Sequence, residues 1–305
     1  MKTLVVLTGP TGVGKTELSL SLAERLGSPI LNADSRQIYR ELPIGTAAPT
    51  AAEQARVRHY FVGTHSLTDA YNAGQYERDA LRLMDELFQT HDRLLMVGGA
   101  MLYIDAVCNG LDAIPAVPDP LRQALRAQYE QEGLGWLQAQ VREFDPDYWD
   151  ACDQQNPQRL LHALEVTRAA GQPYSTFRTG RRTERPFRVV KIALTRPRDV
   201  LYARINARVT GMLEAGLEDE ARRVMPLRHL NALNTVGYKE MFRYIDGECS
   251  LSEAADLIRQ NSRHYAKRQL TWFRADETMH WIDLESAGPA ELLGQIEQLI
   301  DNESK

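Results

Sequence analysis

The sequence predicts an α/β protein: a parallel sheet flanked by helices, with an all-helical insertion domain. Strand-like and helix-like segments alternate through its first half, which is typical of a parallel sheet with helical crossovers. The run 9–16 is a Gly-rich turn that ends in Lys-Thr and stands between a strand and a helix. A proline-dense junction at 114–120 precedes a long helical block, after which a strand pattern returns.

Apolar, β-branched runs mark the strands, and apolar residues repeating every three or four positions mark the helices. Strands are predicted at residues 3–8, 29–33, 60–63, 94–97, 187–195 and 279–282. Helices are predicted at residues 14–26, 52–56, 75–89, 101–108, 199–215, 217–224, 238–245, 252–273 and 289–300. The block 121–171 is helical, with breaks at 133–135 and at 156–157, where Asn156 should cap a helix beginning at Pro157. The core is thus predicted at 1–118 and 183–305, and the insertion at 119–182.

The Gly-rich run matches the phosphate-loop pattern at every fixed position and predicts a diphosphate- or triphosphate-binding site. Backbone N–H groups of the loop and of the following helix N-terminus converge on an anion. Lys15 supplies a point charge for the outer phosphate, and the Thr16 hydroxyl is placed to ligate Mg. The sheet is therefore P-loop NTPase-like, and a purely structural turn is the alternative. The loop consists of Gly9, Pro10, Thr11, Gly12, Val13, Gly14, Lys15 and Thr16.

Two further segments follow predicted strands, namely 34–39 and the pair Gly98-Gly99. Ligands of parallel α/β sheets bind at the carboxyl ends of the strands, so we expect both segments to share one crevice with the phosphate loop. Kinases and NTPases usually place a carboxylate after a hydrophobic strand. Asp34 could serve, but the run 94–97 ends in two glycines instead of a second carboxylate. An ATP-dependent small-molecule kinase would also leave the insertion without a role.

Composition indicates an ordinary soluble protein, with 43% hydrophobic and 25% charged residues. The N-terminal apolar run is too short for a signal peptide, and no later run is long enough to span a membrane. The three cysteines are far apart, and the seven histidines form no H-E-x-x-H pair. These features argue against a disulfide framework or a structural zinc site, and they fit a reducing cytoplasm. We expect a monomer.

Basic residues are concentrated in two tracts, although the net charge is −5. Residues 178–208 hold nine Arg and one Lys against two acids, and residues 259–274 hold four Arg and one Lys with no acid. In the second tract Arg259, Arg263 and Lys267 recur every four residues, which predicts a cationic stripe along a helix whose other face, including Leu251 and Tyr265, is core. Such tracts suggest a localised surface for a polyanion, and a solvated helix face is the alternative.

The motifs together resemble the tRNA dimethylallyltransferase family. The resemblance runs from Thr3 to about Trp281. It rests on Gly-Pro-Thr-x-x-Gly-Lys-Thr at 9–16, Asp-Ser-x-Gln-Ile-Tyr at 34–39, Ile-Gly-Thr-Ala at 44–47, Gly-Gly at 98–99, Asn-Pro-Gln-Arg at 156–159, Val-Gly-Tyr at 236–238 and Ala-Lys-Arg-Gln-x-Thr-Trp at 266–272. The resemblance implies transfer of a dimethylallyl group to the exocyclic amine of the adenine 3′ of the anticodon, with release of diphosphate.

The resemblance also implies roles for individual residues. The phosphate loop would bind dimethylallyl diphosphate instead of ATP, with Lys15 and Arg208 holding the leaving group and Mg on Thr16. Asp34 would accept the proton of the attacking amine. The base must leave its stack to reach the allyl group. The residues expected to contact tRNA are Ser35, Arg36, Gln37, Ala100, Arg122, Gln158, Arg159, His162, Val236, Gly237, Tyr238, Lys267 and Arg268, with the tract 178–198 as further phosphate contacts.

One position departs from the family pattern, because Ala100 stands where the family usually has Thr or Ser after Gly-Gly. Loss of a hydroxyl donor to a charged oxygen costs about 1.5–3 kcal/mol if nothing replaces it. Two other functions compete with tRNA prenyl transfer. One is an isopentenyltransferase acting on free adenine nucleotides, and the other is an ATP-dependent small-molecule kinase or a non-catalytic RNA-binding P-loop protein.

Overall fold

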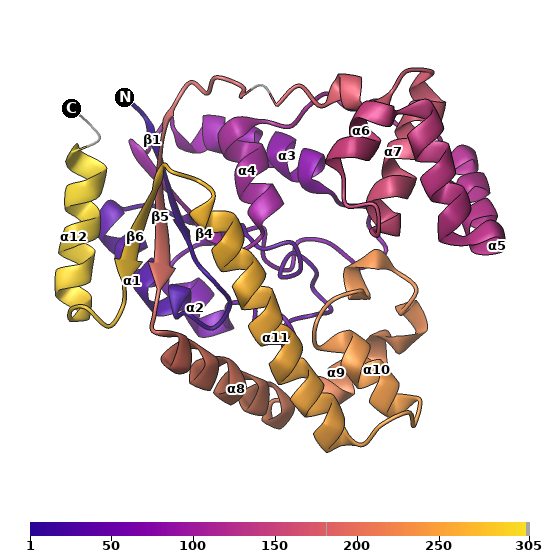
Figure 1. Cartoon of the computed structure of the whole chain (residues 1–305). Helices are drawn as coiled ribbons and strands as arrows, with labels where there is room; N and C mark the ends of the chain where they lie inside the picture. The colour runs from indigo at the N-terminus through magenta and orange to yellow at the C-terminus, as the bar shows by residue number, and fades with distance from the viewer. Residues whose placement is uncertain (181, 303–305) are drawn as a thin grey trace. The chain divides into compact units, whose positions relative to one another are not determined.

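The computed structural model describes residues 1–180 and 182–302 and contains one six-stranded, fully parallel sheet (Figure 1). The strand order is β3-β2-β4-β1-β5-β6. The strands are β1 (Thr3–Thr8), β2 (Ile30–Ala33), β3 (His59–Tyr60), β4 (Arg93–Gly98), β5 (Arg188–Thr195) and β6 (Met279–Asp283). This confirms the predicted fold class. β3 is displaced from its predicted position because Phe61, with φ at 63°, turns the chain out of the strand.

Helices connect the strands along the chain (Figure 1). They are α1 (Lys15–Leu26), α2 (Ala51–Arg56), α3 (Ala73–Leu87), α4 (Met101–Asn109), α5 (Asp119–Phe144), α6 (Pro146–Ala151), α7 (Pro157–Ala170), α8 (Arg198–Glu214), α9 (Leu217–Val224), α10 (Tyr238–Ile245), α11 (Leu251–Arg274) and α12 (Pro289–Asn302), with 3₁₀ turns at Tyr174–Phe177, Met225–Leu227 and Asn231–Leu233. Every residue of β1 and β2 is buried, as expected for central strands covered on both faces.

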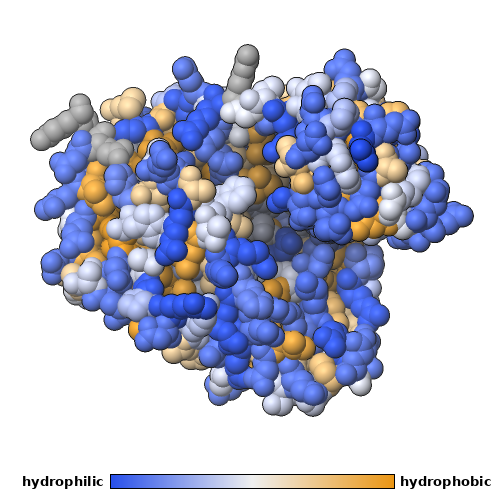
Figure 2. All heavy atoms as spheres, in the orientation of Figure 1, coloured by the Kyte–Doolittle hydropathy of each residue, from blue (hydrophilic) through white to orange (hydrophobic). Residues whose placement is uncertain are grey.

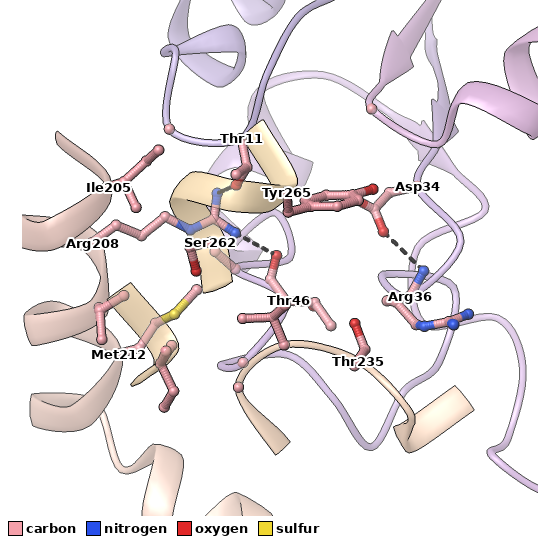
Figure 3. A pocket seen from close by; sticks show the side chains of 18 of the residues that line it. Thr11, Asp34, Arg36, Thr46, Ile205, Arg208, Met212, Thr235, Ser262 and Tyr265 are labelled. Atoms are coloured by element: carbon pink, nitrogen blue, oxygen red, sulfur yellow. Dashed lines mark hydrogen bonds between the residues drawn. The ribbon is translucent and has the colours of Figure 1, made fainter. Parts of the chain in front are cut away.

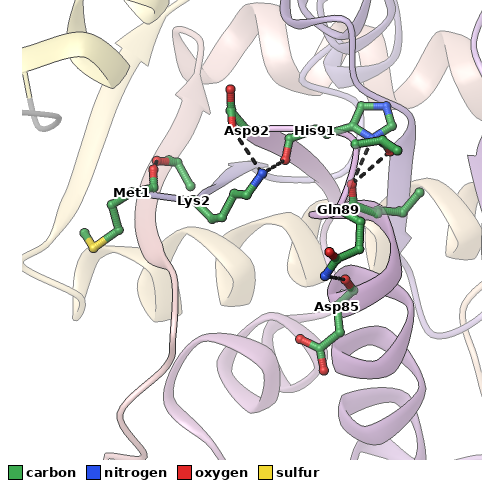
Figure 4. Close-up of polar contacts among 9 residues, drawn as sticks. Met1, Lys2, Asp85, Gln89, His91 and Asp92 are labelled. Carbon is green, nitrogen blue, oxygen red and sulfur yellow. Dashed lines mark hydrogen bonds and ion pairs between the residues drawn. The ribbon is translucent and has the colours of Figure 1, made fainter.

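The neighbouring strands β1 and β4 are also joined at their amino ends (Figure 4). β1 pairs with β4 in the register Thr3 to Arg93. Just before it, Lys2 Nζ donates to the His91 carbonyl at 2.8 Å and to the Asp92 carboxylate at 3.0 Å. These bonds fix where both strands start, and therefore which residues stand at their carboxyl ends, where the phosphate loop and Gly98 lie.

The chain divides into two compact units, residues 1–109 with 184–305 and residues 110–183. The smaller unit is helical and has its own core, built from Leu125, Leu137, Val141, Tyr148, Leu160, Ala163 and Leu164. The predicted break at 133–135 is a kink within α5 at Gly133 (φ 80°). The predicted Asn156 cap is confirmed, since its side chain accepts from Arg159 N at 3.2 Å. A further break, at Asp145-Pro146, was not predicted.

Hydrophilic residues cover most of the face shown in Figure 2, with hydrophobic residues scattered among them. Within the described parts of the chain, no helix combines the length and the apolar character needed to cross a bilayer.

Candidate functional site

The phosphate loop joins β1 to α1 and presents a bare helix N-terminus. Gly14 adopts a left-handed conformation with φ at 105°, which favours glycine, and it precedes α1 as its N-cap. In the described chain no side chain accepts from the first-turn N–H groups of α1. A helix end without an internal cap exposes N–H donors and the positive end of the helix dipole, which together favour an anion.

Lys15 lies under the loop. Its ammonium donates to the Gly9 carbonyl at 2.8 Å and to the Pro10 carbonyl at 3.0 Å. Burial, reinforced by the nearby positive charge of Arg208, lowers the pKa of Lys15 to about 8, while the carboxylate of Asp34 opposes the change. Both hydrogen-bond acceptors of Lys15 are neutral, so an anion that reached the ammonium would add the charge pairing that these carbonyls do not supply.

Asp34 follows β2 directly and faces the same cavity. Its Oδ1 accepts from Arg36 N at 2.8 Å and from Gln37 N at 3.2 Å, which fixes the carboxylate at the turn after the strand. Oδ2 has no hydrogen-bond partner within residues 1–180 and 182–302. Figure 3 shows the Asp34 side chain next to the ring of Tyr265. One oxygen is thus positioned by the backbone, and the other is free to accept a proton.

A cavity of about 720 Å³ joins these groups (Figure 3). One wall is polar and carries the phosphate loop together with residues 34–37. Another wall is apolar, because helices α8 and α11 contribute Ile205, Val209, Met212 and Ile258. The cavity therefore combines an anion site, a carboxylate and an apolar surface, as an apolar group carried on a diphosphate would require.

Arg208, on α8, spans two segments of the polar wall. It donates to the Thr11 hydroxyl through Nη1 at 3.1 Å and to the Thr46 carbonyl through Nη2 at 3.0 Å (Figure 3). Burial lowers its pKa, and the opposing charge of Asp34 partly restores it. Because an arginine stays protonated at neutral pH, the site holds a second, partly buried cation next to Lys15.

Gln269, on α11, is a site residue that the sequence analysis did not single out. Its side chain is buried, with Oε1 accepting from Thr11 N at 2.8 Å and Nε2 donating to the Gly99 carbonyl at 2.9 Å. It therefore fastens the phosphate loop to the end of β4. The adjoining Gly98 packs so closely that a Cβ there would lie 2.1 Å from the Ala33 carbonyl oxygen, which explains why this turn is made of glycine.

Most of the predicted core-site residues lie on the cavity wall. They are Thr11, Gly12, Gly14, Lys15, Thr16, Asp34, Ser35, Arg36, Gln37, Arg208, Val236, Gly237 and Arg268. Gly9, Pro10 and Val13 are buried behind the wall. The Gln37 amide is already engaged, because it donates to the Thr46 and Ala47 carbonyls at 3.1 and 3.0 Å.

Two predicted tRNA contacts need correction. Tyr238 is fully buried, and its hydroxyl donates to Glu220 at 2.6 Å, so its side chain cannot touch a bound RNA. Ala100 is 9% exposed and is not part of the cavity wall. Its N–H donates to the Ala33 carbonyl. Its position directly before α4 makes it a helix cap residue.

The predicted contacts in the smaller unit lie along α5 and α7. Arg122 pairs with Asp119 at 3.6 Å and with the buried Glu165 at 3.4 Å, so it has structural partners of its own. Gln158, Arg159 and His162 are exposed on α7, and the His162 ring packs edge-on against Tyr174. Partial loss of water around the ring, where it packs against its neighbours, lowers the pKa of His162. A role for these residues in binding RNA stays a prediction.

The basic tract 178–208 is not a continuous surface. Arg185 pairs with Glu77, and Lys191 is a buried partner of Asp276 at 2.8 Å. Arg196 and Arg204 donate to carbonyls of the phosphate loop, those of Val13 and Gly12, at 2.7 and 3.0 Å. Most of the described tract therefore fastens the fold and the loop, and Arg181 lies outside the described residues.

The predicted cationic stripe on α11 is also shorter than expected. Arg259 donates to Thr210 and Arg263 donates to Asn206, at 3.2 and 2.7 Å, so both lie against the neighbouring helix α8. Lys267 and Arg268 remain exposed. The opposite face was also misassigned, since Leu251 is 37% exposed and Tyr265 lines the cavity instead of the core.

The chain's own carboxylates and imidazoles do not build a metal centre. Over the residues that the structure describes, no group of three or more His, Cys, Asp or Glu side chains is placed to hold an ion. Thr16 is exposed on the cavity wall, and its hydroxyl has no protein partner there. A Mg ion held by this hydroxyl and by phosphate oxygens of a substrate is compatible with that donor set.

Comparison with known proteins identifies the family. A family model described as IPP transferase matches residues 37–276. The chain belongs to this family. It is 57% identical over 284 residues, 93% of this chain and 95% of the relative, to a tRNA dimethylallyltransferase 2 of Porphyromonas gingivalis. It is 56% identical over 279 residues, 92% of this chain and 93% of the relative, to a tRNA dimethylallyltransferase 1 of Phocaeicola vulgatus. These findings confirm the resemblance seen in the motifs.

Solved structures agree. A full-length tRNA isopentenylpyrophosphate transferase from Bacillus halodurans matches with a TM-score of 0.72 and 33% identity, over 100% of both chains. A eukaryotic dimethylallyltransferase acting on tRNA matches with a TM-score of 0.83 over 99% of this chain and 80% of that one. At 20% identity, the second match bears on the fold alone.

Proposed function

We propose that this protein transfers a dimethylallyl group from dimethylallyl diphosphate to the exocyclic amine of the adenine 3′ of the anticodon in tRNA, releasing diphosphate in the cytoplasm. One observation carries the proposal. A single cavity holds a phosphate loop with two partly buried cations, a carboxylate with one oxygen that no described residue hydrogen-bonds, and an apolar wall. Relatives more than half identical to this chain are named as tRNA dimethylallyltransferases.

The diphosphate would bind at the N-terminus of α1, next to Lys15 and Arg208. Negative charge grows on the leaving oxygen as the C–O bond breaks, and these cations stabilise it more in the transition state than in the substrate. A bound Mg, held by Thr16, would add further neutralisation of the phosphates. The dimethylallyl group would lie against the apolar residues of α8, among them Ile205 and Met212.

Asp34 would act as the general base. The amine nitrogen forms a bond to the allylic carbon, the carbon–oxygen bond breaks, and diphosphate leaves with the electron pair. The amine proton passes to Oδ2 of Asp34, the oxygen that no described residue hydrogen-bonds. The hydrogen bonds from Arg36 N and Gln37 N hold the carboxylate in place during this step, so no reorientation is required.

RNA would be held by groups outside the reacting centre. Exposed Lys267 and Arg268 on α11 can contact phosphates, and Arg159 with Gln158 offers a second set in the smaller unit. An isopentenyltransferase for free adenine nucleotides would use the same cavity and would not need these groups. A kinase would use the phosphate loop for ATP. The experiment below separates these functions by where the label appears.

The test uses labelled dimethylallyl diphosphate with unmodified tRNA, with AMP, and with Asp34→Asn as the decisive variant. Asparagine keeps Oδ1 for the two backbone N–H groups and replaces the proton-accepting oxygen with an NH₂ group, so turnover should fall about 10²–10⁴-fold with tRNA affinity unchanged. Asp256→Asn, an exposed carboxylate on α11, is the matched control. Label in AMP but not in tRNA, or ATP turnover without prenyl transfer, contradicts the proposal.

A further inference from the structure

One face of α11 lines the cavity from end to end. Ile258, Ser262, Tyr265 and Gln269 follow one another at spacings of four, three and four residues, which places them on the same side of a helix. Gln269 fastens the phosphate loop, and Ile258 joins the apolar wall. Tyr265 lies between them, and its ring projects into the cavity beside Asp34 (Figure 3).

Among the described residues that line the cavity, Tyr265 is the single aromatic one. Tyr76 and Tyr103 stack on each other at 4.3 Å between centroids, away from the wall, and Tyr238 is fully buried. The Tyr265 hydroxyl has no hydrogen-bond partner in the described chain, in contrast to the buried hydroxyls of Tyr76 and Tyr238. No hydrogen bond to a described residue therefore accounts for the presence of this hydroxyl in the cavity.

The surroundings of the ring suit a nucleobase. Burial raises the pKa of Tyr265 to about 12, with Asp34 adding to the increase, so the ring is neutral at physiological pH and does not repel an electron-rich base. The Arg268 guanidinium carbon lies 5.7 Å from the ring centroid, and Arg268 also lines the cavity. A cation there can contact the RNA backbone of a base that rests on the ring.

We propose that the target adenine, once it has left the anticodon-loop stack, stacks on the ring of Tyr265 with its exocyclic amine toward Asp34. This inference rests on the proposed function. A flipped base loses the stacking energy of its neighbours, and an aromatic side chain in the receiving pocket restores part of it. Tyr265 is a positioning residue in this scheme, because it holds the base and leaves the proton transfer to Asp34.

The test measures binding of two anticodon stem-loop RNAs without any prenyl donor. One RNA carries adenine at the target position, and the other is abasic there. The wild-type protein should bind the adenine form more tightly by about 5- to 150-fold, the range that stacking of one base on an aromatic side chain supports. Tyr265→Phe should keep this preference, because the ring remains. Tyr265→Leu should lose most of it, and Tyr265→Met is a second ringless variant if the first folds poorly.

Tyr60→Leu is the matched control, since Tyr60 also carries an arginine over its ring, Arg58 at 4.8 Å, and does not line the cavity. It should keep the wild-type preference. The inference is overturned if a folded ringless variant still prefers the adenine RNA, or if Tyr265→Phe loses the preference, which would assign the effect to the hydroxyl. Failure of the proposed function has a different signature, because the wild-type protein would then prenylate no tRNA at all.

Discussion

The position of the turn at residues 44–46, which contacts Arg208, depends on one buried carboxylate, and this dependence can be tested. Glu220, on α9, is fully buried and accepts three hydrogen bonds, from Ile44 N at 2.8 Å, Gly45 N at 2.7 Å and the Tyr238 hydroxyl at 2.6 Å. Burial raises the pKa of Tyr238, and the charge of Glu220 raises it further. The next residue along the loop is Thr46, whose carbonyl accepts from Arg208.

Glu220→Gln keeps the shape of the side chain but leaves an NH₂ group facing at least one of these donors. Losing a charge-assisted hydrogen bond costs about 1.5–3 kcal/mol, and orphaning a buried donor costs about 1–3 kcal/mol. Removing a buried charge also removes its desolvation penalty, which offsets part of these losses. We therefore expect the free energy of unfolding to fall by about 2–4 kcal/mol. At about 2–4 °C per kcal/mol for a large domain, Tm should fall by about 4–16 °C.

Calorimetry and urea titration measure the stability, and steady-state prenylation measures the site. Because a displaced Thr46 would release Arg208, kcat/KM should fall at least about tenfold. Glu218→Gln on the same helix, where the partner is the exposed Arg222, should change the stability by less than about 0.5 kcal/mol. Combining Glu220→Gln with Tyr238→Phe should give a coupling energy of about 0.5–3 kcal/mol. A Glu220→Gln protein as stable and active as wild type would refute the reasoning.

Three further outcomes are expected. Burial lowers the pKa of Lys15 to about 8, and the bound anion needs the charged ammonium. Affinity for an unreactive dimethylallyl diphosphate analogue should therefore fall by up to about tenfold per pH unit above pH 8. Lys15→Arg stays charged and should show a flat pH profile, and an equally steep profile would exclude Lys15 as the titrating group. Replacing Lys267 and Arg268 with Gln should reduce the magnitude of the slope of log K for tRNA binding against log salt concentration by about 1.5. An unchanged slope would show that these residues form a solvated helix face and do not contact phosphates. Ala100→Ser should add an N-cap to α4 and raise the free energy of unfolding in urea by about 1 kcal/mol, and an unchanged or lower value would contradict this.

Local patterns predicted the fold well because each one reports a contact between near neighbours. The phosphate loop could be read because Gly14 needs a left-handed conformation and the strand and helix flank it directly. The break before α6 also has a local signal, because Asp145 caps the helix and Pro146 occupies its first position. Local sequence chemistry is therefore a sufficient guide to the elements that carry the site.

Long-range polar contacts were not predictable in the same way. Glu220 lies 175 residues from Gly45, and Gln269 lies 258 residues from Thr11, so no local spacing connects either pair. The basic tract misled for a related reason. Charge counts reveal how many cations a segment carries. They do not reveal that the guanidinium groups of Arg196 and Arg204 donate to the carbonyls of Val13 and Gly12. Only the three-dimensional structure separates cations held by the protein from those left for a ligand.

This separation also indicates where in the phosphate loop an anion binds. The Thr11 N–H is already taken by Gln269, and the Val13 N–H by the Pro10 carbonyl at 3.3 Å, so the first half of the loop has little left to donate. The uncapped first turn of α1 retains its donors, and among the described residues the cations of Lys15 and Arg208 have only neutral acceptors. The diphosphate is therefore expected over the helix N-terminus. From there the allylic carbon can lie between Arg208 and Asp34, where bond breaking and proton transfer meet.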